Sequence, residues 1–148
     1  MSESKSAKHL TACLEQLNNA TLWLHRSYEQ CQHIDITKPL SAEELDKLEN
    51  LTSRFARTVD ILINKVYRAL DALELQEPGS LIDTINRAAK KGLIDSIEEA
   101  RRLKDIRNEI AHEYVVSNLT NILKEVLTGT TLVFDLVERA RKHSEKIR

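Results

Sequence analysis

Glycine and proline are scarce in this chain, and their scarcity limits how often the backbone can turn. The 148 residues include three Gly and two Pro, too few for the many turns of a β-sandwich or a β-barrel. Aromatic residues make up only 4% of the chain, whereas hydrophobic residues make up 41% and charged residues 30%. We therefore predict an all-α protein built from a few long helices. One domain accounts for a chain of this length.

Cysteine is also rare, and the two that occur do not form a recognisable site. Cys13 and Cys31 lack the clustered spacing of a zinc site and the density of a disulfide scaffold. Their separation of five helical turns places them about 27 Å apart along one helix, too far for a disulfide. We predict two reduced, buried cysteines and neither a metal site nor a cofactor.

Long apolar runs are absent as well. No stretch of about 18 apolar residues occurs, and residues 1–8 are polar. We therefore predict a cytoplasmic protein without membrane contact, with a flexible tail over residues 1–8 and one helical-bundle domain over residues 9–148. The net charge of −1 argues against an overall basic nucleic-acid binder and leaves room for a local basic patch.

Apolar residues recur three and four positions apart, which predicts amphipathic helices. The first helix is expected over residues 5–32, and a loop that contains proline follows over residues 33–40. Ser41 and Glu44 have the spacing of a capping box. They begin a second helix that is expected to end near residue 75.

The second half of the chain has similar signals. Ser80 is predicted to cap a short third helix that ends near Gly92. Asp95 is predicted to cap a fourth helix, and the last helix is expected over residues 118–146, with a bend at Gly129. Together these elements predict an up-and-down four-helix bundle with an additional short helix.

The most informative stretch is Arg-Asn-Glu-Ile-Ala-His-Glu-Tyr at residues 107–114. Arg107 offers a planar fork of donors suited to phosphate oxygens. His112 can give or take a proton near neutral pH. Asn108 precedes His112 by four residues, so its amide can orient the imidazole or contact the phosphate. Together, a proton carrier and a cation of this kind can serve the cleavage of an RNA phosphodiester without a metal.

The spacing of these residues constrains the site. Five positions on an α-helix leave Arg107 and His112 about 140° apart around the axis. For both side chains to reach one phosphate, either the helix loosens near His112 or a second copy of the motif completes the site across a two-fold axis. The sequence therefore hints at a composite site in a homodimer.

Arg-x-x-x-x-His-x-Tyr near the end of an internal helix, in a small helical chain, resembles the HEPN family. The resemblance is greatest to the HepT-like toxins that pair with minimal nucleotidyltransferase antitoxins. It extends to residues 54–60 and 92–94, and it covers about residues 10–137. A sister branch, the nucleotidyltransferase substrate-binding proteins, shares this layout.

The resemblance implies a function and its residues. The chain would be a homodimeric toxin that cleaves RNA without a metal, with Arg107 and His112 as catalytic residues and Asn108 in support. The cognate minimal nucleotidyltransferase antitoxin would transfer AMP to Tyr114 and thereby block the substrate phosphate. Lys104 and Arg101 would contribute to RNA binding. The sister branch implies the alternative of a non-catalytic substrate-binding subunit of a two-component nucleotidyltransferase.

Simpler interpretations of the same residues remain open. Arginine and histidine on a helix are usually solvated or meet the dipole of the helix end, and a tyrosine such as Tyr114 is usually a partly buried core residue. The basic residues between Arg87 and Arg107 fit ordinary solvated helix faces equally well. A helical interaction protein whose Arg107 and His112 only form ion pairs is the third possibility. The chain itself lacks the paired acidic residues that a nucleotidyltransferase needs after Gly79-Ser80.

Overall fold

The computed structural model describes residues 4–74, 76–112 and 116–147; for residues 111, 112 and 116–119 it describes the backbone alone. Every regular element in these ranges is a helix, which confirms the prediction of an all-α fold. The elements are α1 (Lys5–Cys31), α2 (Ala42–Asp60), the π-helical segment η1 (Ile61–Val66), α3 (Tyr67–Leu73), α4 (Leu81–Lys90), α5 (Ile97–His112) and α6 (Val116–Ile147).

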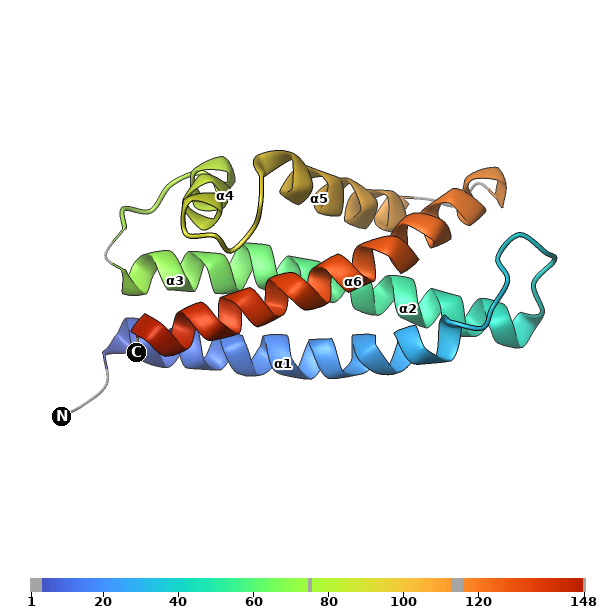
Figure 1. Cartoon of the computed structure of the whole chain (residues 1–148), viewed down its shortest axis with the longest axis horizontal. Coiled ribbons are helices and arrows are strands. Elements are labelled where there is room, and N and C mark those ends of the chain that lie inside the picture. The colour runs from blue at the N-terminus through green and yellow to red at the C-terminus, as the bar shows by residue number, and fades with distance from the viewer. Residues whose placement is uncertain (1–3, 75, 113–115, 148) are drawn as a thin grey trace.

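The long helices run alternately in opposite directions along one axis (Figure 1). α1, the α2–η1–α3 rod, α5 and α6 form the bundle, and α4 lies at the end where the rod finishes. The rod contacts all three of the other long helices through α2. One continuous core fills the space between them, and its largest fully buried side chains include Tyr67 and Phe55.

Local capping signals set most helix beginnings. The Ser4 hydroxyl accepts a hydrogen bond from the Ala7 amide and starts α1 at Lys5, inside the tail predicted over residues 1–8. The capping box predicted at Ser41 is confirmed. The Ser41 hydroxyl accepts a hydrogen bond from the Glu44 amide, and the Glu44 carboxylate accepts one from the Ser41 amide. These bonds satisfy amide groups that the first helical turn leaves without intrahelical partners.

The α2–η1–α3 rod is helical without interruption from Ala42 to Leu73, close to the predicted end near residue 75. Its π-helical segment over residues 61–66 was not predicted. There the Tyr67 amide donates to the Leu62 carbonyl five residues earlier, instead of to the carbonyl four residues earlier. Such segments are rare and are often found at functional sites.

The prediction that Asp95 caps α5 is wrong. The Ser96 hydroxyl accepts the Glu99 amide at 3.1 Å, so Ser96 satisfies the first turn. The Asp95 carboxylate instead accepts from Arg139 Nη1 at 2.7 Å, and this hydrogen bond, together with the charge of Arg139, lowers the pKa of Asp95. A cation from α6 therefore attracts the side chain that the local pattern assigned to the helix end.

α6 remains helical through Gly129, where the sequence predicted a bend. A Cβ atom at Gly129 would lie 3.2 Å from two ring carbons of Phe55, and Phe55 has no exposed surface. The glycine therefore lets α6 pack closely over the Phe55 ring. The break predicted after Tyr114 falls on residues 113–115, outside the described residues.

Both cysteines are buried and free, as predicted. Cys13 and Cys31 lie on the core side of α1, with 3% and 1% of their surfaces exposed. Burial raises the pKa of each thiol, an effect larger than the lowering by Lys65 at Cys13 and by Lys47 at Cys31. Both are structural core residues.

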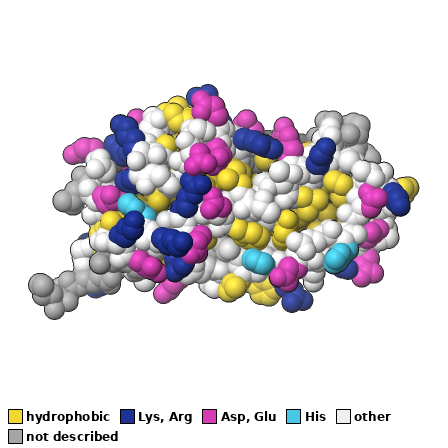
Figure 2. Space-filling model, in the orientation of Figure 1, with side chains coloured by type: hydrophobic (Ala, Val, Ile, Leu, Met, Phe, Trp, Pro, Cys, Tyr) yellow, Lys and Arg dark blue, Asp and Glu magenta, His cyan; other side chains and the backbone are white. Residues whose placement is uncertain are grey.

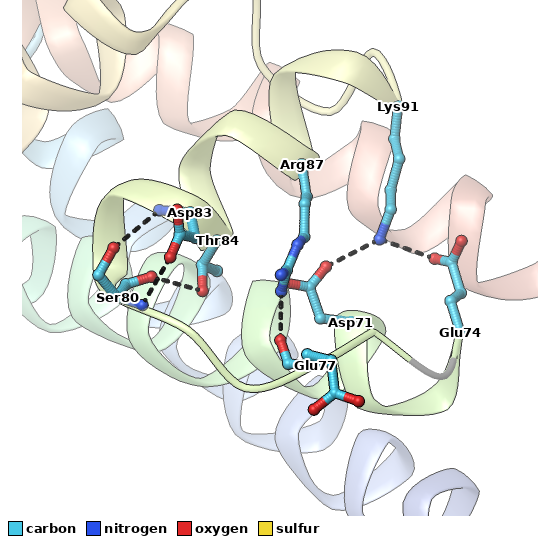
Figure 3. A network of polar contacts seen from close by, with 8 residues as sticks. All are labelled: Asp71, Glu74, Glu77, Ser80, Asp83, Thr84, Arg87 and Lys91. Atoms are coloured by element: carbon cyan, nitrogen blue, oxygen red, sulfur yellow. Dashed lines mark hydrogen bonds and ion pairs between the residues drawn. The ribbon is translucent and has the colours of Figure 1, made fainter.

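An ionic network fastens α4 to the end of α3 (Figure 3). The buried Asp71 carboxylate meets Lys91 Nζ at 2.9 Å and Arg87 Nη1 at 3.3 Å. Arg87 also donates to the Glu77 carbonyl at 2.7 Å, and Lys91 pairs with Glu74 at 3.0 Å. The network thus fixes the connection that leads from the rod into α4, and through α4 into α5.

We expect Gly129→Ala to lower the free energy of unfolding by about 1 kcal/mol. The strain of overpacking against Phe55, about 1–3 kcal/mol, exceeds the gain of roughly 1 kcal/mol that alanine usually gives in a helix. Urea unfolding measures the change. In a Phe55→Leu background the same substitution should cost less, and strictly additive effects would contradict the close contact.

Glu74 should contribute to the pH dependence of stability. Burial raises its pKa, but hydrogen bonds from His143 and Lys91 outweigh burial and hold the pKa below its ordinary value of 4.5. Because the folded-state pKa is the lower one, ionised Glu74 stabilises the fold above about pH 4.5, and that contribution disappears as the pH falls through the folded-state value.

Glu74→Gln should therefore cost about 1 kcal/mol at pH 7 and clearly less at pH 3, as measured by urea unfolding at both values. The exposed Glu15→Gln is the control and should change stability by less than about 0.5 kcal/mol at either pH. A cost for Glu74→Gln that is equal at both pH values would contradict the role of the ionised carboxylate.

Candidate functional site

α5 presents the predicted motif at the edge of the bundle. Its apolar side is buried through Ala100, Leu103 and Ile106. Arg107 follows directly after this stripe, so its side chain emerges where α5 meets α2, with 37% of its surface exposed. The periodicity of α5 thus places the guanidinium at the boundary between core and solvent.

Asp60 holds the Arg107 guanidinium. Nε of Arg107 lies 3.0 Å from Oδ1 and 3.1 Å from Oδ2 of Asp60, and Nη1 donates to Asn108 Oδ1 at 3.3 Å. A guanidinium has five N–H donors. Two are engaged within the described part of the chain, so three stay available to a ligand such as a phosphate oxygen.

Of the predicted catalytic residues, Arg107 and Asn108 are therefore brought together by a direct hydrogen bond. His112 is the last residue of α5, but its side chain lies outside the description, as does all of Tyr114. α5 stays α-helical through His112, so the loosening that would bring His112 round to Arg107 is not found. We therefore still predict that a second copy of the chain completes the site.

The two predicted RNA-binding residues lie three positions apart on α5, about 60° apart around its axis, and have different neighbours. Lys104 is half-buried one turn before Asn108, on the side that faces α2. Arg101 lies beside a groove between α5 and α6, together with Arg102 and with the carboxylates of Glu98, Asp105, Glu109 and Glu125. This acidic setting disfavours phosphate binding, so Lys104 has the better placement of the two.

A cavity of about 690 Å³ also lies between α5 and α6. Arg102, Glu109 and Lys124 are among its lining residues. On α5, Arg102 is about 140° from Arg107, so the cavity and the motif arginine occupy different sides of the helix. On the face that α6 crosses, positive and negative side chains are interspersed (Figure 2), which gives this face no net preference for a polyanion.

Sequence reasoning missed Asp60 as a functional residue. It belongs to the segment over residues 54–60 that carries part of the family resemblance, yet nothing local connects it to an arginine 47 residues later. The only available signal was its isolation, because it is the sole carboxylate between Arg54 and Arg68. The π-helical segment begins directly after it, so the acceptor for Arg107 sits where the helical geometry changes.

No group of three or more His, Cys, Asp or Glu side chains in the described residues is arranged to hold a metal ion. Among the helices that are described, none has the length and apolar character needed to cross a membrane.

Comparison of the chain with known protein families, with curated proteins and with solved structures finds no match. The fold and the site define an all-α helical-bundle protein with a polar cluster of Asp60, Arg107 and Asn108 between α2 and α5.

Asp60→Asn should cost at most about 1 kcal/mol of unfolding free energy. Both side chains of the ion pair are 37% exposed, and pairs with such exposure contribute about 0–1 kcal/mol. Urea unfolding of the variant tests this expectation. A loss above about 2 kcal/mol would show that the pair is a main stabilising contact, whereas a small loss makes the variant a clean probe of how Arg107 is oriented.

Proposed function

We propose that the chain is a toxin of the HEPN type, a metal-independent endoribonuclease that acts in the cytoplasm. The observation that carries the proposal is the octapeptide at residues 107–114, whose arginine lies at the surface with three N–H donors available. The contacts with Asp60 and Asn108 support it, because they hold a planar donor group in one orientation before substrate arrives.

The proposed reaction is an intramolecular transesterification at phosphorus. The 2′-oxygen of a ribose attacks the adjacent phosphate and gives up its proton to a base. The P–O5′ bond breaks, the leaving 5′-oxygen gains a proton, and a 2′,3′-cyclic phosphate remains on the other product. His112 handles one of these protons. Arg107 stabilises the extra negative charge on the phosphorane through its free N–H groups.

Asp60 and Asn108 act as positioning residues in this scheme. Asp60 accepts from Nε of Arg107, and within the described residues no hydrogen bond joins it to the two terminal nitrogens. Asn108 occupies one further N–H and lies at 3.3 Å, a contact that a phosphate oxygen can displace. The arrangement keeps the cation from folding back onto the bundle while leaving its fork open.

A homodimer is part of the proposal. On a regular helix His112 is about 140° from Arg107, and α5 is regular through His112. Two copies related by a two-fold axis would bring His112 of one protomer to Arg107 of its partner. The RNA would then lie in a cleft that both copies line, with Lys104 beside it.

Control of the toxin would come from a separate nucleotidyltransferase antitoxin. It would transfer AMP from a nucleoside triphosphate to the Tyr114 hydroxyl, with release of pyrophosphate. The new phosphodiester would carry a negative charge and a nucleoside close to Arg107, and both would exclude the substrate phosphate.

The second candidate is a non-catalytic substrate-binding subunit of a two-component nucleotidyltransferase. One observation favours it: the guanidinium of Arg107 already has a carboxylate partner, as expected for an arginine with a structural role. This candidate predicts the same bundle and a dimer but no RNA cleavage.

Cleavage of total RNA by the purified protein in excess EDTA separates the two. We expect cleavage by the wild type, a loss of about 10²–10³-fold for Arg107→Ala and a loss of about 10²–10⁴-fold for His112→Ala. Arg102→Ala, which removes an arginine on the α6 side of the same helix, is the matched control and should cleave normally.

Inactivity of an unmodified, folded wild-type dimer would support the binding subunit and overturn the nuclease. Growth provides a second readout, because expression of the wild-type chain alone should arrest growth and His112→Ala should relieve the arrest. A toxic His112→Ala variant would contradict the assignment of the catalytic proton carrier.

A further inference from the structure

The outer side of the α2–η1–α3 rod changes its charge at Arg54. Residues 42–53 carry four carboxylates and one lysine, whereas residues 54–68 carry four cations and one carboxylate. The four cations are Arg54, Arg57, Lys65 and Arg68, and all except the half-buried Arg54 are exposed. Within the described residues none of them pairs with a carboxylate. The single carboxylate, Asp60, is already engaged by Arg107.

The only tryptophan of the chain lies at the start of this basic segment. Trp23 on α1 is 55% exposed, and the Arg54 guanidinium carbon lies 5.0 Å from the centroid of its ring. Arg54 Nη1 donates to Ser27 Oγ at 2.7 Å, which fixes the cation over the indole. The result is a partly exposed aromatic ring with a positive charge against it.

This surface lies close to the candidate catalytic centre. Arg54 and Asp60 are about 120° apart around α2, and Arg57 projects between them. α5 runs antiparallel to α2 (Figure 1), and Asp60 pairs with Arg107. Arg54, about 9 Å back along α2, is therefore roughly level with the end of α5. Trp23 and Arg107 therefore lie on opposite flanks of α2, beside residues that are about 9 Å apart along its axis.

We propose that Trp23, Arg54 and Arg57 form a subsite for single-stranded RNA. A base stacks on the exposed indole of Trp23, and the backbone phosphates that follow cross α2 on Arg54 and Arg57 toward Arg107. This subsite rests on the proposed ribonuclease function and adds to it a preference for unpaired substrate. Aromatic platforms beside a track of cations are how proteins hold single strands without reading their sequence.

The surroundings favour RNA over a protein partner. Leu22 is the other exposed apolar side chain nearby, but it projects about 100° away from Trp23 around α1. The two therefore do not combine into an apolar patch of the kind that protein interfaces bury. The nearest rod cation is Arg54, and neither it nor Arg57, one turn further on, has a carboxylate partner within the described residues, so both can attract a polyanion.

The seam between α1 and the rod, where Arg54 lies over Trp23, continues from Trp23 toward the start of α1. Two turns earlier on α1, Gln16 accepts a hydrogen bond from Lys65 at 3.0 Å, at a groove of about 350 Å³ that Arg68 also lines. Cations thus follow the seam for about 20 Å from Arg54 to Arg68. A strand longer than a few nucleotides has further phosphate contacts along this path.

Fluorescence tests the subsite because Trp23 is the sole tryptophan. The His112→Ala chain, which does not consume the substrate, is titrated with a single-stranded oligouridylate and with a duplex RNA of equal length. We expect saturable quenching of the tryptophan emission by the single strand, with several-fold weaker binding of the duplex. No quenching at concentrations that bind RNA by an independent method would overturn the proposal.

Single substitutions test which side chains bind the RNA. Trp23→Ala should weaken single-strand binding roughly tenfold or more, Trp23→Phe should retain most of it, and Arg57→Gln should reduce the salt dependence of log K by about 0.7. Leu22→Ala is the control and should bind normally. Equal binding by Trp23→Ala and Leu22→Ala, or a concentration-dependent blue shift of Trp23 emission without RNA, would assign Trp23 to a protein contact instead.

The two proposals fail separately. If RNA quenches Trp23 but the wild type does not cleave it, the ribonuclease proposal is wrong and the binding surface stands. If the wild type cleaves and Trp23→Ala leaves KM unchanged, the catalytic proposal stands and the subsite is wrong.

Discussion

The burial of one stripe of α2 is the constraint on which the rest of the bundle depends. α2 packs against α1, α5 and α6, and its residues Leu48, Leu51, Phe55 and Val59 are almost completely buried. Once that stripe faces the core, the opposite side of the same helix must face solvent. Arg57 and Asp60 lie on that outer side. The packing that stabilises the bundle therefore also sets the surface on which the candidate site is built.

The ion pair between Asp60 and Arg107 connects the scaffold to the proposed catalytic arginine. It is too exposed to contribute much to stability, and its main effect is geometric. Asp60 occupies the Nε side of the guanidinium and leaves the terminal nitrogens free, so the cation is oriented without being neutralised at every donor. The π-helical segment begins directly after Asp60, so the side chains that follow project at angles that differ from those of a continuous α-helix.

The sequence was sufficient for features that short stretches of chain determine. The capping box at Ser41, the buried cysteines and the long amphipathic helices all depend on residues within a few turns of one another, and the structure confirms them. Contacts across the bundle were not predictable in this way. Asp95 left its expected capping role because Arg139 approaches it from α6, and Asp60 gained its role from Arg107, 47 residues away. The stacking of Arg54 on Trp23 is also a contact between two helices, which periodicity cannot specify.

In the proposed reaction the RNA's own 2′-hydroxyl attacks the phosphate, Arg107 stabilises charge and His112 moves a proton. The most direct measurement is therefore incubation of the wild-type chain in excess EDTA with a single-stranded RNA and with the same sequence as DNA, followed by analysis of the product ends. Only the RNA should be cut, and its fragments should carry 2′,3′-cyclic phosphates. Cleavage of the DNA, or no cleavage of either strand by a folded and unmodified dimer, would contradict this reaction.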